Sequence, residues 1–249
     1  MSIFSDIVSV LDDVVSLILL RSCIICGAPI DEDSVCEACK NRIPLTHFAG
    51  EEDNAIEIHL KNLIPIEHAA SLYWYVSIPE WKSIIYNFKY YGRWAMARRM
   101  GKWLGEELRR GGRYDDVDVI IAVPLHVERR LMRSYNQSEQ LALGVSSVLD
   151  IPCDFKAVRR MQYNESQTRK RRSERWGNVS EIFFVRSPER LRGRHVLIVD
   201  DVLTTGATII SCAQRIVDAC EGDVRISIAT LAVSHRLFEY TYNPVFKKI

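Results

Sequence analysis

Two adjacent carboxylates and a loop of small and hydroxyl-bearing residues stand out in the stretch HVLIVDDVLTTGAT, residues 195–208. An apolar run ends in Asp200 and Asp201. The loop behind them contains Thr204, Thr205, Gly206, Ala207 and Thr208. If this loop opens a helix, unpaired backbone N–H groups and the helix dipole attract a phosphate. The carboxylates would repel a bare phosphate, but they accept hydrogen bonds from ribose hydroxyls, directly or through hydrated Mg²⁺. The stretch therefore predicts a ribose 5-phosphate site; the alternative is an acidic turn that only caps a helix.

Four cysteines form a second group that could do chemistry, as two C-x2-C pairs with nine residues between them. They are Cys23, Cys26, Cys36 and Cys39. Two such turns complete a tetrahedral sulfur site, and four thiolates leave no open position for a substrate. The spacing predicts a structural zinc site, with a pair of disulfides or a redox pair as the alternatives. The other cysteines, Cys153, Cys212 and Cys220, have no such spacing and are expected to be buried apolar side chains.

Strands and helices that alternate along the chain must position the acidic stretch. The pattern predicts strands over residues 71–76, 117–124, 181–185, 195–201 and 224–233. It predicts helices over residues 79–92, 93–110, 136–150 and 207–220. This alternation indicates an α/β fold with a mainly parallel sheet. Ligands of such sheets bind at the carboxyl ends of the strands, where Asp200 and Asp201 are expected.

Composition and the first residues narrow the class of protein. The chain has 249 residues, 47% of them hydrophobic and 26% charged, with a net charge of +1, as expected for a globular protein. Attraction to nucleic acid must therefore come from a local patch. Residues 1–20 are apolar but acidic and lack a basic leader, which favours a helix docked on the protein over a signal peptide. A partner-binding or membrane-surface helix is the alternative; we expect a cytoplasmic protein without membrane insertion.

The acidic stretch resembles a known signature. IVDDVLTTGAT is similar to the ribose-phosphate motif of type I phosphoribosyltransferases, which bind 5-phosphoribosyl 1-diphosphate with Mg²⁺. The resemblance implies a doubly wound parallel sheet. It also implies that Asp200 and Asp201 hold the ribose 2′ and 3′ hydroxyls, and that residues 204–208 hold the 5′-phosphate.

A cysteine ribbon ahead of such a domain resembles the ComF family of competence and gluconate-utilisation-associated proteins. The similar segments are FKYYG (88–92), VPLHVERRLMRSYNQ (123–137) and SQTRKRRSERWGNVSEIF (166–183). One departure is Ser134, which stands where the family commonly has glycine. The chain is expected to have three parts, because apolar residues in 1–20 repeat on one helix face and the pattern changes between about 45 and 70. The parts are an N-terminal helix (1–20), a zinc ribbon with its connector (21–65) and a domain that resembles a phosphoribosyltransferase (66–249). The resemblance also implies a role in DNA uptake, with a helicase as a further expected partner.

Arginines after the strand at 117–124 are candidates for holding the diphosphate at C1 of the ribose. They are Arg129, Arg130 and Arg133. The planar guanidinium group bonds phosphate with two N–H groups. Two alternatives stay open. Related enzymes use mainly backbone N–H groups here, and ion pairs with Glu128 or Glu139 would occupy the side chains.

The segment 156–178 is strongly basic and, by position, resembles the flexible loop that closes over substrate in this superfamily. A closed lid would exclude water and bring cations to the developing charge. A contact with single-stranded DNA is an alternative, because bases could stack on Tyr163 and Trp176; a solvated loop without a ligand is another. The residues concerned are Arg169, Lys170, Arg171, Arg172 and Arg175.

Two functions from different classes fit these features. The first is a Mg²⁺-dependent phosphoribosyltransferase, an enzyme of pentosyl transfer in which Asp200 and Asp201 are the central residues. The second is a non-catalytic protein of DNA uptake that keeps the fold and binds single-stranded DNA or a partner. A sensor of the sugar diphosphate without turnover is a third reading. The complete ribose-phosphate loop favours retained ligand binding, but no segment indicates a nucleobase acceptor.

Overall fold

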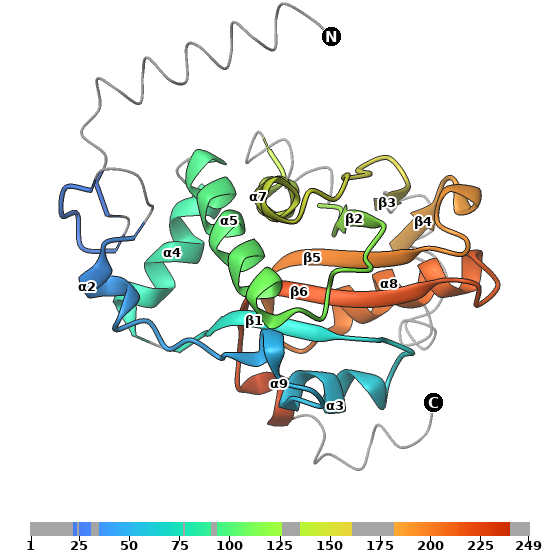
Figure 1. Ribbon diagram of the computed structural model, residues 1–249, viewed down its shortest axis with the longest axis horizontal. Coiled ribbons are helices and arrows are strands. Elements are labelled where there is room, and N and C mark those ends of the chain that lie inside the picture. Colours follow the sequence, from blue (N-terminus) through green and yellow to red (C-terminus); the bar gives the residue numbers. More distant parts are fainter. Residues whose placement is uncertain are drawn as a thin grey trace, which may run out of the picture.

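The structure is a computed structural model, and it describes residues 22–23, 25–30, 35–76, 78–90, 94–125, 135–160 and 182–239. The helix predicted over residues 1–20 lies outside the described residues. Figure 1 shows the described chain as a twisted sheet with helices packed against it. None of the helices in the described part of the chain is long and apolar enough to cross a bilayer.

Four parallel strands form the central sheet, in the order β1-β6-β5-β2 (Figure 1). The strands are β1 (Ala69–Trp74), β6 (Arg225–Val233), β5 (His195–Leu203) and β2 (Val119–Ala122). The first five residues of β5 are all buried, as expected for a central strand that is covered on both faces. The predicted α/β fold with a parallel sheet is confirmed.

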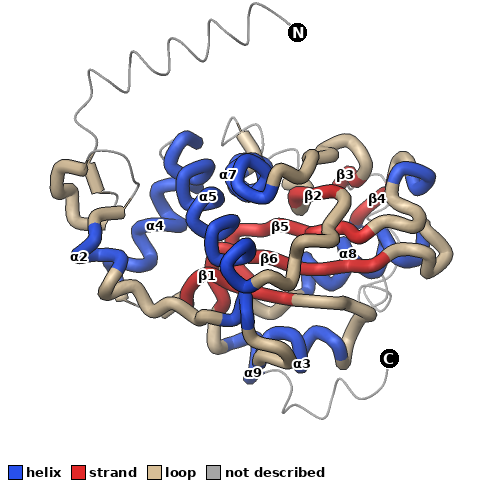
Figure 2. The backbone as a smooth tube through the Cα atoms, viewed as in Figure 1, coloured by secondary structure: helices blue, strands red, loops and turns tan. Residues whose placement is uncertain are grey.

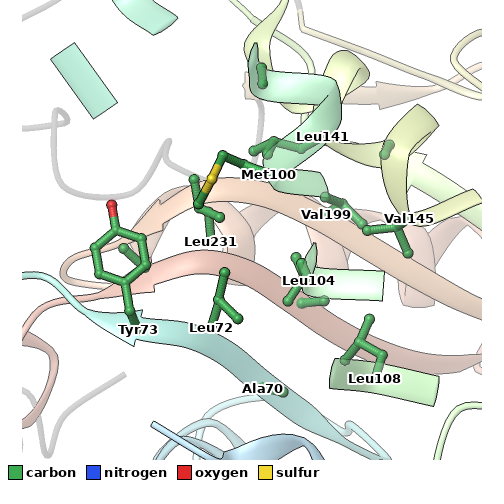
Figure 3. Packing of buried hydrophobic residues seen from close by; sticks show 14 of the residues in the cluster. Ala70, Leu72, Tyr73, Met100, Leu104, Leu108, Leu141, Val145, Val199 and Leu231 are labelled. Carbon is green, nitrogen blue, oxygen red and sulfur yellow. The ribbon is translucent and has the colours of Figure 1, made fainter. Parts of the chain in front are cut away.

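Helices cover both faces of this sheet (Figure 2). One face carries α4 (Pro79–Tyr90), α5 (Trp94–Gly111) and α7 (Gln137–Leu149); the other carries α3 (Ala55–Lys61) and α8 (Ala207–Ala219). Figure 3 shows the first face, where Met100 of α5 lies beside Leu231 of the sheet and Leu104 lies further along α5. All three side chains are buried. Burial on both faces makes the sheet doubly wound, as the resemblance implied.

Helices α5 and α7 approach each other closely through glycine. A Cβ atom on Gly144 would lie 2.1 Å from the carbonyl oxygen of Arg98, and one on Gly101 would lie 2.2 Å from that of Leu141. Only residues without a side chain allow the two backbones to touch in this way. This contact helps to fix where α7, and with it the N-terminus of α7, lies against the sheet.

Two elements depart from the sequence-based expectation. Helix α3 lies where no element was predicted, and the Asn54 side chain caps it by accepting hydrogen bonds from two backbone N–H groups. Strand β3 (Val158–Arg160) pairs antiparallel with β4 (Phe183–Val185). The basic segment 156–178 was expected to be a loop throughout, and this is wrong for residues 158–160, because ladder bonds to β4 hold them in a strand. The short elements are α2 (Glu37–Lys40), η1 (Phe48–Gly50), η5 (Pro188–Arg190) and α9 (Arg236–Glu239).

The cysteine segment shares a hydrophobic cluster with the sheet and its helices. Cys39 and Ile43 belong to the same buried cluster as Trp81 of α4 and Leu108 of α5. Packing of this kind couples the stability of the ribbon to that of the larger unit. The division at residues 1–20, 21–65 and 66–249 stays a prediction.

Candidate functional site

A cavity of about 150 Å³ lies at the carboxyl ends of β2 and β5. The chain leaves β2 toward α7 on one face of the sheet and leaves β5 toward α8 on the other. Adjacent strands whose connections leave to opposite faces open a crevice, which is the usual ligand site of doubly wound sheets. The cavity lining includes Asp200, Asp201, Thr204, Thr205, Gly206, Ala207 and Thr208. The structure therefore brings these predicted residues together.

Asp200 and Asp201 lie near the end of β5, and both are half-buried. The Asp200 Oδ1 atom accepts a hydrogen bond from Ser138 Oγ at 2.7 Å. The same oxygen accepts a second bond from the backbone N–H of Asp201 at 2.9 Å. Two donors on one oxygen fix the orientation of this carboxylate at the cavity wall.

The loop after β5 enters α8 through Gly206, which is buried and has a left-handed φ of 77°. The backbone conformation favours glycine, and a Cβ atom here would also lie 2.9 Å from Ile210 Cδ1, so that side chain would have to shift. Thr204, Thr205 and Thr208 are exposed at the cavity. Helix α8 has 13 residues, and the N–H groups of its first turn lack helical partners and favour an anion.

Asn136 ties the start of α7 to the end of β2. Its Oδ1 atom accepts a hydrogen bond from the backbone N–H of Ser138 at 3.1 Å, and its Nδ2 atom donates one to the Val123 carbonyl at 3.1 Å. The Asn136 side chain is buried. This cap places Ser138 beside Asp200 and so links the two walls of the cavity.

Three further residues with polar side chains line the cavity and were not predicted as site residues: Gln137, Ser138 and Arg160. Ser138 could have been predicted from the sequence. Asn136 is a helix-capping residue that follows a buried strand, so Ser138 is expected in the first turn of a helix at the ligand-binding edge of the sheet. Arg160 gave no such signal, since nothing in the sequence separates it from Arg159 or from the other cations of its basic segment.

Two groups of predicted residues lie outside the described residues, and their roles stay predictions. The group expected to hold a diphosphate is Arg129, Arg130 and Arg133. The group expected to form a lid or a DNA contact is Arg169, Lys170, Arg171, Arg172 and Arg175.

The four predicted metal ligands gather in one place, distant in sequence from the cavity residues. The sulfur atoms of Cys23, Cys26, Cys36 and Cys39 all lie within 4.8 Å of one another. None of the four is in a disulfide, and the Cys26 and Cys36 sulfurs are 3.6 Å apart. Zn–S bonds of about 2.3 Å in a tetrahedron separate the sulfurs by about 3.8 Å. The donor set and its spacing therefore fit a zinc ion.

Local electrostatics differ between the buried members of this cluster. Burial raises the pKa of the Cys23 thiol, but hydrogen bonds from backbone N–H groups, among them that of Cys36, lower it more, and the pKa falls to about 6. The Cys36 N–H lies 3.4 Å from the Cys23 sulfur. Burial raises the pKa of Cys39. Backbone donors that stabilise a thiolate also suit a metal-bound sulfur.

The remaining cysteines are structural. Cys212 and Cys220 are buried, as predicted, whereas Cys153 is half-buried. Burial, and then the charge of Asp200, raise the pKa of the Cys212 thiol to about 12. The raised pKa favours the thiol form of Cys212 over the thiolate at neutral pH.

Part of this chain matches a known protein family. Residues 136–243 match the family described as "Phosphoribosyl transferase domain". This match spans 108 of the 249 residues of the chain. The matched range runs from the start of α7 past β6, so it includes both acidic residues and the loop that enters α8.

The relatives of known name include a DNA utilization protein and a competence protein. The chain is 32% identical over 139 residues to DNA utilization protein YhgH of Escherichia coli, covering 55% of this chain and 60% of that protein. It is 27% identical over 189 residues to competence protein F of Haemophilus influenzae, covering 72% of this chain and 82% of that protein. The predicted resemblance to competence proteins with this domain is thereby confirmed.

One solved structure with a similar fold is an adenine phosphoribosyltransferase. It is 12% identical, with a TM-score of 0.38, over 65% of this chain and 79% of that one. A likeness at this level says nothing about the reaction of this chain.

Proposed function

We propose that the cavity binds 5-phosphoribosyl 1-diphosphate with Mg²⁺, in a protein linked to DNA uptake. The observation that carries the proposal is the meeting of two carboxylates and a glycine-led helix N-terminus in one cavity. Carboxylates accept hydrogen bonds from ribose hydroxyls, and a helix N-terminus attracts a phosphate, so together they suit a phosphorylated ribose.

Each part of the ligand has a partner in this proposal. Asp200 and Asp201 accept hydrogen bonds from the ribose 2′ and 3′ hydroxyls. The backbone N–H groups and hydroxyls of residues 204–208 hold the 5′-phosphate. Arg129, Arg130 and Arg133 remain our candidates for the diphosphate, and the basic residues 169–172 with Arg175 remain candidates for a lid.

Mg²⁺ suits the chemistry of this donor set, because two adjacent carboxylates supply the hard oxygen ligands that it prefers. When bound, it would neutralise charge on the diphosphate leaving group. The reaction class that follows is pentosyl transfer, in which a nucleophile bonds to C1 as the bond from C1 to the diphosphate oxygen breaks. The role of the chain would be to orient the ribose and stabilise the departing anion.

Calorimetry tests the proposal directly. The wild-type protein should bind 5-phosphoribosyl 1-diphosphate in the presence of Mg²⁺, and the double variant Asp200→Asn, Asp201→Asn should not. A matched control is Asp223→Asn, which removes an exposed carboxylate just ahead of β6, at the opposite end of the sheet. Absence of binding by a folded wild-type protein would refute the proposal.

A second candidate function is a non-catalytic role in DNA uptake, through single-stranded DNA or a helicase partner. The homology to competence protein F and to DNA utilization protein YhgH favours it. If the basic segment contacts DNA, affinity for single strands should fall steeply with salt. It should also weaken when Arg169, Lys170, Arg171 and Arg172 are replaced by alanine. Unchanged affinity in that variant would remove the DNA role from this segment.

A further inference from the structure

Arg160 is the only Lys, Arg or His residue among the described residues that line the cavity. It ends strand β3, is half-buried and pairs with Phe183 of β4 in the ladder register. The guanidinium carbon lies 5.5 Å from the centre of the Phe183 ring, a cation–π contact that limits where the group can point. The Phe183 side chain is itself buried. The guanidinium group is therefore held by the fold.

The residues around Arg160 show that it lies on the side of the cavity formed by α8. The Phe183 carbonyl accepts a hydrogen bond from Arg215 Nε of α8 at 3.3 Å, so the β3–β4 ribbon packs beside that helix. Burial and then Asp200 raise the pKa of Cys212, in the second turn of α8, while the charge of Arg160 lowers it. Arg160 also lines the same cavity as residues 204–208, which lead into the first turn of α8.

A positive side chain in the cavity would offset the negative charges that oppose the binding of a phosphate. The acidic side chains of the cavity, Asp200 and Asp201, oppose the entry of a phosphate dianion. The dipole of α8 offsets only about half an elementary charge. A guanidinium group adds a full positive charge and a planar pair of N–H donors that match two phosphate oxygens.

We propose that Arg160 is a side-chain ligand of the 5′-phosphate, completing the anion site that residues 204–208 begin. The proposal rests on the function proposed above for the same cavity and adds a contact that the ribose-phosphate motif itself does not contain. The site then distinguishes phosphorylated from unphosphorylated pentoses through a charged side chain as well as through backbone N–H groups. Phe183 is the positioning residue for this ligand.

Removal of the guanidinium group should weaken binding of the phosphate end. We expect Arg160→Gln to weaken ribose 5-phosphate and 5-phosphoribosyl 1-diphosphate by the same factor, about 10- to 100-fold, as for a charge-assisted hydrogen bond. Arg160→Lys should lose less, because it keeps the charge but not the planar pair of donors. The matched control is Arg159→Gln, one residue earlier on the exposed face of the same strand, which should bind both ligands as the wild type does.

Calorimetry with three ligands separates this proposal from the one on which it rests. Ribose 5-phosphate probes the phosphate end, inorganic pyrophosphate probes the diphosphate end, and 5-phosphoribosyl 1-diphosphate probes both. Unchanged ribose 5-phosphate affinity in Arg160→Gln would overturn the role of Arg160 and leave the proposed function standing. A loss confined to pyrophosphate would also overturn it. A wild-type protein that binds none of the three refutes both.

Phosphorus NMR gives a second readout that does not depend on the fold of the glutamine variant. In the complex with the Arg160→Lys protein, the resonance of the bound 5′-phosphate should shift from its wild-type position, while the two diphosphate resonances stay in place. A shift of the diphosphate resonances alone would contradict the assignment.

Discussion

At the scale of single residues, hydrogen bonds from neighbouring residues orient the Asp200 carboxylate that lines the cavity. Ser138 bonds to the same Asp200 oxygen that the Asp201 N–H contacts, and Asn136 fixes the backbone from which Ser138 extends. A ribose-binding carboxylate must present defined oxygens to two hydroxyls, so its orientation is part of the affinity.

Substitution of Ser138 tests this positioning. Ser138→Ala removes one of the two donors to Asp200 Oδ1, and we expect ribose 5-phosphate to bind about tenfold more weakly, with little loss of stability. Isothermal titration calorimetry measures the effect. Ser147→Ala, which removes a hydroxyl bonded to the Gly144 carbonyl on the same helix, should leave affinity unchanged. Equal affinities in all three proteins would show that Ser138 does not position Asp200.

At the scale of elements, the turn from β5 into α8 requires a particular residue, the glycine at position 206. Gly206→Ala should lower the free energy of unfolding by about 1–3 kcal/mol through its left-handed backbone and the contact with Ile210. It should also abolish ribose 5-phosphate binding, because the turn that presents the N–H groups must shift. Denaturant unfolding and calorimetry check the two effects.

Gly222 provides the control for that substitution. It has a similar φ of 81°, but no heavy atom lies within 4 Å of its missing Cβ. Gly222→Ala should therefore cost about 1–2 kcal/mol of stability through the backbone alone and leave binding intact. Loss of binding in this variant would mean that general destabilisation, and not the shape of the turn, explains the Gly206 result.

The central strands and helices could be predicted from the sequence, because the residue patterns that indicate them lie within each element or directly beside it. The apolar run before Asp200 predicts β5, and Gly206 with the small residues after it predicts the start of α8. The signal fails where long-range contacts decide the structure. Strand β3 has three residues in a basic stretch and exists through its pairing with β4, 23 residues further along the chain by the register Arg160–Phe183. Arg160 became a cavity residue only through that pairing.

At the scale of the whole molecule, the cysteine cluster and the sheet share one core. Cys23 and Cys39 are buried in the cluster that contains Trp81 and Leu108. A zinc ion at this cluster would thus contribute to the stability of the larger unit, and not only to that of its own loop.

Metal removal should lower the unfolding temperature of the entire chain. A loss of even about 3 kcal/mol corresponds to about 6–12 °C in a protein of this size. Metal analysis should find about one zinc per chain, in keeping with four thiolates at one site. Calorimetric scans with and without a chelator measure the shift. An unchanged, single transition in metal-free protein would contradict the coupling.

Two histidines whose pKa values are lowered in the folded chain should make stability depend on pH. Burial and then the Arg113 charge lower the pKa of His68, whose Nδ1 atom lies 3.0 Å from an Arg113 nitrogen. Burial also lowers the pKa of His59. The unfolded chain, with histidine pKa values of about 6.5, therefore binds protons that the folded chain does not. Stability should be complete above that value and fall as the pH drops below it.

Urea unfolding at pH values from about 7.5 to 5 measures this slope. His68→Asn keeps an acceptor near Arg113 but cannot be protonated, so its unfolding free energy should depend less on pH over this range. A variant with the same pH dependence as the wild type would remove His68 from the explanation.

The central claim is that one cavity holds the sugar and its phosphate together. A crystal structure of the protein with ribose 5-phosphate and Mg²⁺ tests it most directly. We predict the phosphate within hydrogen-bond distance of the N–H groups at the start of α8, and the ribose hydroxyls beside Asp200 and Asp201. A phosphate bound elsewhere on the molecule, with these two carboxylates facing only water, would contradict the account.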